Sequence, residues 1–268
     1  MTAASVSNGL RRTTGALLLG GALAFAAAAT ALSSTFGWPD ILREPAEVVL
    51  PAFVAGGTTL VWTWFGTAWA YAILLVPILL LPAALGRHGD PVLRAATYIG
   101  ATSVVLALIG FLRWVFVVPP LADSYVAGNA TTRAAVDAAW TAQHQFGGAL
   151  LGEHLGQLLA VGWSVTLSVV ILRSRVLPRW LGLTGLIAGA LYLTNQGDIL
   201  ATAVPGFPVW DLGGLIGSTA WGLWVAALGV MVLARAPRAT DALLDSDSST
   251  GSTTVPSPRP PAAARVRS

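Results

Sequence analysis

The sequence has 268 residues, of which 55% are hydrophobic and only 10% are charged, and its mean hydropathy is +0.71. A soluble globular domain carries about a quarter charged residues, so the composition excludes that class and predicts an integral membrane protein. The absence of cysteine excludes disulfides, thiolate metal sites and a cysteine nucleophile. The formal charge of +3 comes with arginines at helix ends rather than in a patch, so we expect no nucleic acid partner.

The chain begins with a short polar leader, residues 1–12, which ends on two arginines. Residues 13–36 form an apolar, alanine-rich run about long enough to cross a bilayer as a helix. A cleaved signal peptide is the alternative, because the arginines precede the run and Ala29-Thr30-Ala31 matches a cleavage site. The length of the run favours a first transmembrane helix.

Residues 37–57 break this pattern with three prolines and several charged side chains. The apolar residues between the prolines predict a short helix lying at the membrane interface, and an ordinary acidic loop is the alternative. The second span is predicted over 58–85. Tryptophans mark its outer end, and Pro77 and Pro82 predict kinks in its inner half.

The third span is predicted over 92–118, with Arg113 near its outer end. This arginine either extends to the headgroups or faces inward and pairs with a carboxylate of another helix. A polar connection is expected over 121–132. The fourth span, 150–173, is the apolar part of a longer helix that begins near Ala134.

The fourth predicted helix has two distinct faces. Glycines repeat at every fourth position on one flank, and small residues at this spacing let another helix approach closely in lipid. These glycines, like those of the last span, serve packing within the bundle or between subunits of a homo-oligomer. Polar residues share a neighbouring face about 100° wide. The glycines are Gly148, Gly152 and Gly156, and the polar residues are Gln143, Glu153, His154, Gln157, Ser164 and Ser168.

The last two spans are predicted over 180–204 and 209–234. Asp211 is expected in the first turn of the sixth span, where a carboxylate complements the helix dipole. The remaining residues, 235–268, are rich in Ser, Thr, Pro, Ala and Arg and predict a disordered tail. The outer half of the fifth span carries Asn195, Gln196 and Asp198.

The predicted fold is therefore an all-α bundle of six transmembrane helices over residues 13–234. Six crossings put both termini on one side, and the arginines gather on that side. By the positive-inside rule both termini are cytoplasmic, which predicts a multi-pass protein of the plasma membrane. The arginines concerned are Arg11, Arg12, Arg87, Arg94, Arg173, Arg175, Arg179, Arg235 and Arg238.

Three predicted helices carry polar groups at one level, roughly 5 to 15 Å above the bilayer midplane on the extracytoplasmic side. Burying such groups unpaired costs several kcal/mol, so we expect them to face one another in a polar cavity open to the outside. They are Arg113, Glu153, His154, Gln157, Asn195, Gln196 and Asp198.

The pattern resembles a known family of bacterial multi-span membrane proteins. Its six spans, Leu151-Gly152-Glu153 and the segment Leu177-Pro178-Arg179-Trp180-Leu181-Gly182 are similar to the domain of unknown function 4386 family. The resemblance covers about Arg11 to Ala234. It implies a fold and no activity or catalytic residue.

Three functions compete. An intramembrane enzyme would use Glu153 and His154 as acid and base, but the sequence lacks a His-Glu-x-x-His motif and predicts no metal or cofactor. A transporter or binding protein would hold a small polar or anionic ligand at Arg113. The favoured interpretation is a structural or regulatory membrane protein, in which Arg113 pairs with Glu153 or Asp198 inside a satisfied network.

Overall fold

The computed structural model describes residues 7–235, and every regular element in that range is a helix. This confirms the all-α prediction. The predicted tail lies outside the described residues except for Arg235, as does the first half of the leader.

Five helical segments are long and apolar enough to cross a membrane, which supports a multi-pass membrane protein. The prediction of an uninterrupted fifth span over 180–204 is wrong. That region contains α8 (Arg179–Leu193) and the short α9 (Gln196–Ala201), separated at Thr194-Asn195. The five segments are Asn8–Phe36, Ala46–Ala84, Pro91–Ala127, Ala130–Ser174 and Gly213–Ala234.

The first helix, α1 (Asn8–Phe36), begins earlier than predicted because the Ser7 side chain accepts a hydrogen bond from the Leu10 amide and caps the helix. It ends at Gly37, whose left-handed backbone (φ 66°) suits glycine. A single 3₁₀ turn, η1 (Asp40–Arg43), follows.

Although α2 (Ala46–Ala72) begins directly after Pro45, the predicted start of the second span at residue 58 coincides with a break inside this helix. A kink at Gly57 (φ 57°, ψ −158°) separates its first turns from the rest. The expected interfacial helix in 37–57 is thus η1 and the start of α2. As predicted, Pro77 disturbs the inner half: a proline at this position leaves the Ile73 carbonyl without its helical donor, and α3 (Leu75–Ala84) starts after a break there.

The predicted polar connection over 121–132 is also wrong. After α4 (Pro91–Phe116), the chain continues as α5 (Val118–Ala127) and turns only at Gly128-Asn129. The prolines at 119 and 120 fall near the start of α5, where a missing amide hydrogen leaves no bond unmade.

The segment after this turn is one helical run of 45 residues, Ala130–Ser174. It comprises α6 (Ala130–Gln143), a π-helical stretch η2 (His144–Leu155) and α7 (Gly156–Ser174). The predicted span of 150–173 is therefore only its inner part. The last helix, α10 (Gly213–Ala234), begins after Asp211, so this residue lies before the helix and not in its first turn.

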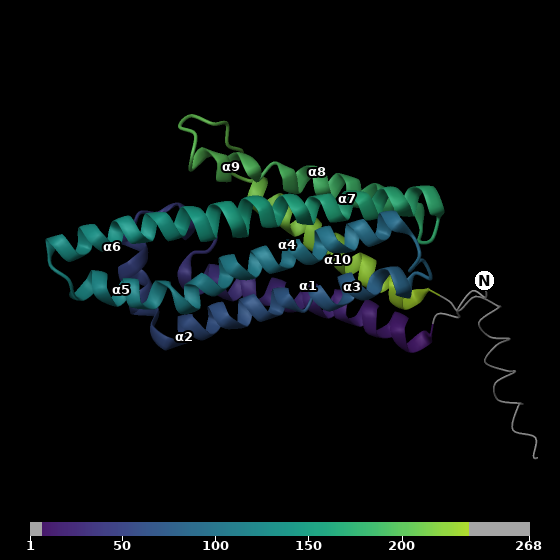
Figure 1. The fold of residues 1–268 in the computed structure, drawn as a ribbon, viewed down its shortest axis with the longest axis horizontal. Coiled ribbons are helices and arrows are strands. Elements are labelled where there is room, and N and C mark those ends of the chain that lie inside the picture. Colours follow the sequence, from purple (N-terminus) through teal and green to yellow (C-terminus); the bar gives the residue numbers. More distant parts are fainter. Residues whose placement is uncertain (1–6, 236–268) are drawn as a thin grey trace, which may run out of the picture. The chain divides into compact units, whose positions relative to one another are not determined.

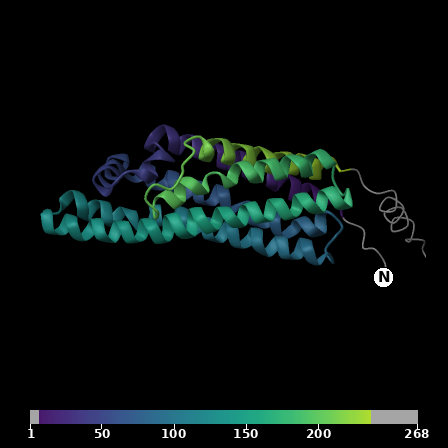
Figure 2. The same ribbon diagram turned by 90° about the horizontal axis from the view of Figure 1, so that it is seen from above.

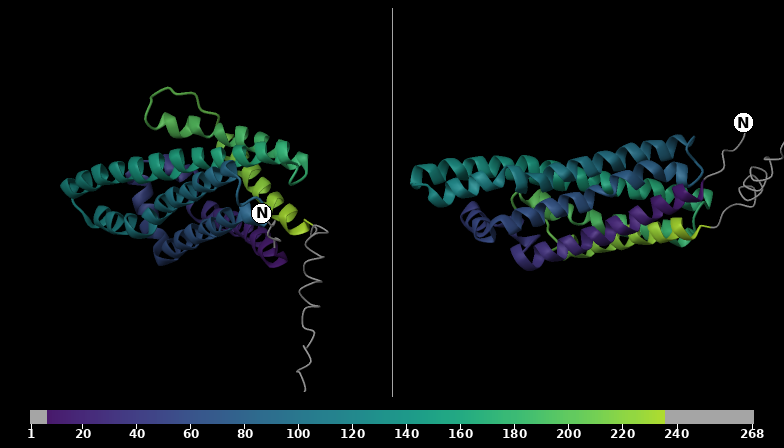
Figure 3. Two further views of the ribbon diagram at one scale, coloured as in Figure 1. Left: turned by 45° about the vertical axis from the view of Figure 1, so that its right-hand side comes forward. Right: turned by 90° about the horizontal axis from the view of Figure 1, so that it is seen from below.

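The long helices form a closed ring of neighbours. Figures 1 and 2 show them running lengthwise beside one another, with the α6–α7 run along α4 and α5. Figure 3 shows α1 and α10 side by side, so the first and last helices close the ring. The order around it is α1, α10, α8, α7, α4 and the α2–α3 segment, which returns to α1.

Glycines allow the close contacts of this ring. An ideal Cβ on Gly152 would lie 2.8 Å from the Cα of Gly110 on α4, and one on Gly15 would lie 2.7 Å from the Gly229 carbonyl of α10. The predicted glycine flanks are thus used within the chain, while a homo-oligomer stays a prediction.

The bundle has two apolar cores, which follow one another along its length. One joins the inner parts of the helices, including Leu167, Leu181 and Leu228, each of which is fully buried. The other joins the end of α1 and the starts of α2, α5 and α6 around the stacked rings of Trp64 and Trp114, whose centroids are 4.7 Å apart. The candidate site lies on the side of this second core that faces α9.

Candidate functional site

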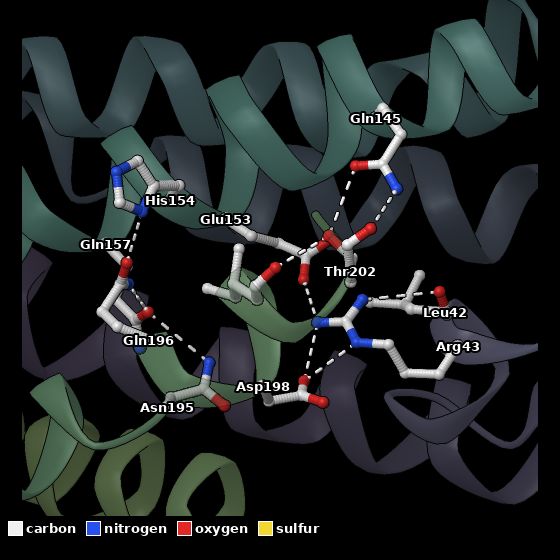
Figure 4. Close-up of polar contacts among 11 residues, drawn as sticks. Leu42, Arg43, Gln145, Glu153, His154, Gln157, Asn195, Gln196, Asp198 and Thr202 are labelled. Carbon is white, nitrogen blue, oxygen red and sulfur yellow. Dashed lines mark hydrogen bonds and ion pairs between the residues drawn. The ribbon is translucent and has the colours of Figure 1, made fainter. Parts of the chain in front are cut away.

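Arg43 is the centre of an ion-pair network that joins three parts of the chain (Figure 4). It stands at the end of η1, and its NH2 group lies 2.7 Å from Glu153 Oε2 of η2 and 2.7 Å from Asp198 Oδ2 of α9. Its Nε donates a second hydrogen bond to Asp198 Oδ2 at 2.9 Å. We call these three residues the Arg43 network.

The network is partly shielded from solvent. The exposed fractions of the side chains are 25% for Arg43, 19% for Glu153 and 36% for Asp198. Burial alone lowers the pKa of Arg43, but the charge of Glu153 and hydrogen bonds with both carboxylates raise that pKa above its ordinary value. The carboxylates therefore offset the cost of burying the Arg43 guanidinium.

A chain of amide side chains runs beside this network. His154 Nδ1 lies 2.6 Å from Gln196 Oε1, and Gln196 Nε2 donates to Gln157 Oε1. Gln157 Nε2 donates in turn to the backbone carbonyl of Tyr192 at 3.0 Å, and Asn195 Nδ2 reaches Gln157 Oε1 at 3.5 Å. The polar face of η2 and α7 is thereby fixed to the break between α8 and α9.

The π-helical stretch positions this face. Its hydrogen bonds run from residue i to i+5, so side chains turn differently from those of an α-helix, and such segments often occur at functional sites. Gln145, at its start, exchanges hydrogen bonds of 3.4 and 3.3 Å with Thr202 beyond α9. Three successive levels of η2 and α7, at Gln145, Glu153 and Gln157, therefore contact the α9 region.

Arg113 does not join the Arg43 network. Its side chain is only 7% exposed, so it does not extend to the headgroups, and its NH1 group donates to the Gly110 carbonyl at 3.0 Å. The guanidinium lies beside Gly148, where an ideal Cβ would come within 2.5 Å of it, and 5.3 Å from the Trp114 ring. The predicted pairing of Arg113 with Glu153 or Asp198 is thus wrong: within residues 7–235 the ion pairs of both carboxylates are with Arg43.

Several buried polar atoms around Arg113 have no hydrogen-bond partner among residues 7–235. They are Nε and NH2 of Arg113, Nδ1 of His144 and Oε1 of Glu153. Charge interactions connect Arg113 with Glu153, and His144 with both. An unmade hydrogen bond of this kind costs roughly 1–3 kcal/mol, so these atoms mark a place where a bound polar molecule would be stabilised.

Six of the seven predicted site residues therefore fall in two groups of direct contacts. Glu153 and Asp198 bind Arg43, while His154, Gln157, Asn195 and Gln196 form the neighbouring chain of hydrogen bonds. Gln143, predicted on the same face, is exposed. Sequence reasoning missed Arg43 and Thr202. The charge of Arg43 could have identified it. The segments assigned to the extracytoplasmic side carry only two arginines, so Arg43 was one of few cations there that could pair with the predicted carboxylates. Within residues 7–235, no group of three or more His, Asp or Glu side chains is arranged to hold a metal ion.

The long apolar helices and the polar groups between their outer ends define an α-helical protein of the multi-pass membrane type. Residues 13–229 match the model of a family described as domain of unknown function (DUF4386), and the chain belongs to this family. The resemblance drawn from the sequence is thereby confirmed. No curated protein and no solved structure matches the chain.

Proposed function

We propose that the protein is a six-span protein of the plasma membrane with a structural or regulatory role, in which the Arg43 network fixes the outer connections to the bundle. The observation that carries this proposal is the bridging position of Arg43. One guanidinium contacts two carboxylates that stand 110 and 155 residues further along the chain.

The placement in the membrane has separate support. The α3–α4 and α7–α8 turns, the start of α1 and the end of α10 lie at one end of the bundle (right in Figure 1). Eight arginines fall in these segments, and positive loops favour the cytoplasm. α8 has only 15 residues but packs along both α7 and α10, and in this proposal α8 and α9 together supply the sixth crossing. The arginines are Arg11, Arg12, Arg87, Arg94, Arg173, Arg175, Arg179 and Arg235.

The test measures the stability of Glu153→Gln in mild detergent. Unfolding is monitored by tryptophan fluorescence. Removing the charge weakens one ion pair of Arg43, and we expect a loss of about 1–3 kcal/mol, as for hydrogen bonds to charged groups. Asp137→Asn is the matched control, because this exposed carboxylate lies on α6 of the same helical run.

A double-mutant cycle with Arg43→Gln makes the test specific. If the two side chains interact favourably, the double variant loses less stability than the sum of the losses of the two single variants. Unchanged stability of Glu153→Gln, or strictly additive losses, would contradict the proposal.

A second candidate function, binding of a small polar or anionic ligand, is favoured by the unpartnered atoms of Arg113, His144 and Glu153. Such a ligand must accept hydrogen bonds from Arg113 and donate one to Glu153. A small hydroxy acid has both kinds of group. Binding would raise the unfolding temperature of the purified protein, and Arg113→Gln would remove this rise.

A further inference from the structure

An open groove lies at the arginine-rich end of the bundle. It is next to the C-terminal end of α7, whereas the Arg43 network lies beyond the N-terminal end of this helix. It is formed by the α7–α8 turn and the last turn of α10, and its volume is about 380 Å³. Among residues 7–235, its lining combines three arginines with apolar residues and includes no carboxylate. The residues that matter here are Arg175, Leu177, Pro178, Arg179, Met231 and Arg235.

The backbone of the turn sets two of these arginines close together. Arg175 ends α7 in a left-handed conformation (φ 55°), and Pro178 precedes the first residue of α8, Arg179. Two arginines four positions apart thus stand on either side of one tight turn. Arg235 approaches from α10, where its NH1 group donates to the Leu85 carbonyl at 2.9 Å.

The charges of the two arginines of the turn are not neutralised by other residues within 7–235. Arg175 and Arg179 are exposed, and among residues 7–235 neither forms an ion pair or a side-chain hydrogen bond. Cations held in proximity repel one another and attract an anion, and a planar guanidinium matches the geometry of a phosphate.

The apolar lining distinguishes a lipid from a free anion. Met231 and the exposed Ala234 of α10, together with the exposed Pro178 of the turn, supply apolar surface beside the arginines, and Trp180, the next residue after Arg179, is 50% exposed. Exposed tryptophan at the end of a membrane helix is typical of the headgroup level. An acyl chain can therefore follow the apolar residues while its phosphate meets the arginines.

We propose that this groove binds the headgroup of an anionic phospholipid from the leaflet at the arginine-rich end. Basic pockets between transmembrane helices on the cytoplasmic side are suited to this class of ligand. The proposal depends on the membrane placement given above and is independent of the Arg43 network.

The experiment uses the whole protein, stripped of lipid in mild detergent and titrated with phosphatidylglycerol or with phosphatidylcholine of the same acyl chains. Native mass spectrometry reports the bound fraction. We expect tighter binding of phosphatidylglycerol. The double variant Arg175→Gln/Arg179→Gln is expected to bind it about 30-fold more weakly, which corresponds to about 1 kcal/mol for each arginine removed.

The matched control is Arg12→Gln/Arg94→Gln, which removes two exposed arginines from the same end outside the groove. It should bind phosphatidylglycerol within about twofold of the unchanged protein. Equal loss in both double variants would overturn the proposal, because it would indicate a general charge effect.

Two further outcomes are decisive on the unchanged protein alone, so the test does not depend on the variants folding. Equal affinity for both lipids would overturn an anionic headgroup site. Complete competition by an equal concentration of inorganic phosphate would show a free-anion site instead. A loss of stability in Glu153→Gln changes neither readout, so this proposal and the proposed function fail separately.

Discussion

At the scale of single residues, the contact between Gly110 and Gly152 sets how closely α4 approaches the Ala130–Ser174 run. Each Cα lies 2.8 Å from where a Cβ on the other would be, a distance that no side-chain rotation relieves because both atoms belong to the backbone. Gly148 plays a related part, since its missing side chain leaves room for the Arg113 guanidinium. Small residues therefore set both the helix spacing and the position of a buried cation.

We expect Gly152→Ala to destabilise the protein by about 1–3 kcal/mol, as overpacking of a close contact does. Gly162→Ala on the same helical run is the control. Its added methyl group would meet Ile99 at an ordinary 3.6 Å, and the gain in helix propensity is up to about 1 kcal/mol. Thermal unfolding in detergent measures both. Equal stabilities of the two variants would show that the helices separate freely at this point.

Also at this scale, the sequence predicted the participants of the site better than their pairing. Periodicity places Glu153 and Gln157 on one face, and depth places Asn195, Gln196 and Asp198 at the same level. The sequence pattern does not show which arginine pairs with the carboxylates of this level. Arg43 stands on a turn whose direction depends on the packing of η1. Arg113 was the nearer choice by depth, yet its guanidinium is held by the Gly110 carbonyl and the Trp114 ring.

At the scale of elements, the outer aromatic core holds the extended parts of α2, α4 and α6 together. Trp64 is fully buried and stacks on Trp114, which in turn contacts the Trp140 ring at 5.6 Å. Rings in such contact are worth about 0.5–1.5 kcal/mol per pair beyond the area that they bury. The π-helical stretch and the Arg43 network depend on this core for their position.

Trp64→Ala is expected to destabilise the protein by about 3–5 kcal/mol, the usual loss for a large buried aromatic side chain. Trp62→Ala, two residues earlier on α2, removes a side chain that is 65% exposed and should change the stability by less than about 0.5 kcal/mol. Chemical denaturation followed by circular dichroism compares them. A small loss for Trp64→Ala would mean that the outer core contributes little to holding α2.

The sequence predicted the helices correctly where hydrophobicity alone determines their position. It failed where proline or the hydrogen-bond register of the backbone determines the helix limits. Apolar runs located the inner parts of all the long helices. The extensions beyond the apolar runs were missed, because prolines at 45, 119 and 120 were interpreted as helix breakers although each stands at or near a helix start. The π-helical register of η2 has no simple sequence pattern and changes which side chains share a face.

At the scale of the whole molecule, the number of crossings depends on whether α8 and α9 together traverse the bilayer. The chain contains no cysteine, so a single cysteine can be introduced at any exposed position as a unique label. His88 and Phe207 are exposed in two different connections, and the exposed Thr131 is the second residue of α6, next to the Gly128-Asn129 turn. They report on the two ends of the bundle independently.

With six crossings and cytoplasmic termini, a membrane-impermeant maleimide should label Thr131→Cys and Phe207→Cys in intact cells, and His88→Cys only after permeabilisation. This outcome follows from the distribution of arginines between the two ends. Protection of Phe207→Cys in intact cells would show that α8 and α9 return to the side they started from, which leaves five segments to account for the topology.

The spacing of the Arg43 network along the chain has a consequence for biosynthesis. Arg43 is synthesised 155 residues before Asp198, and at about 5–20 residues per second this interval lasts roughly 8 to 30 s. Throughout that time α10 has not been synthesised, α8 is incomplete until near the end of the interval, and the guanidinium has no Asp198 to bind. The ion pair with Asp198 therefore forms only after α8 has been delivered to the membrane, which makes it a late step in assembly that follows insertion of the first four long segments.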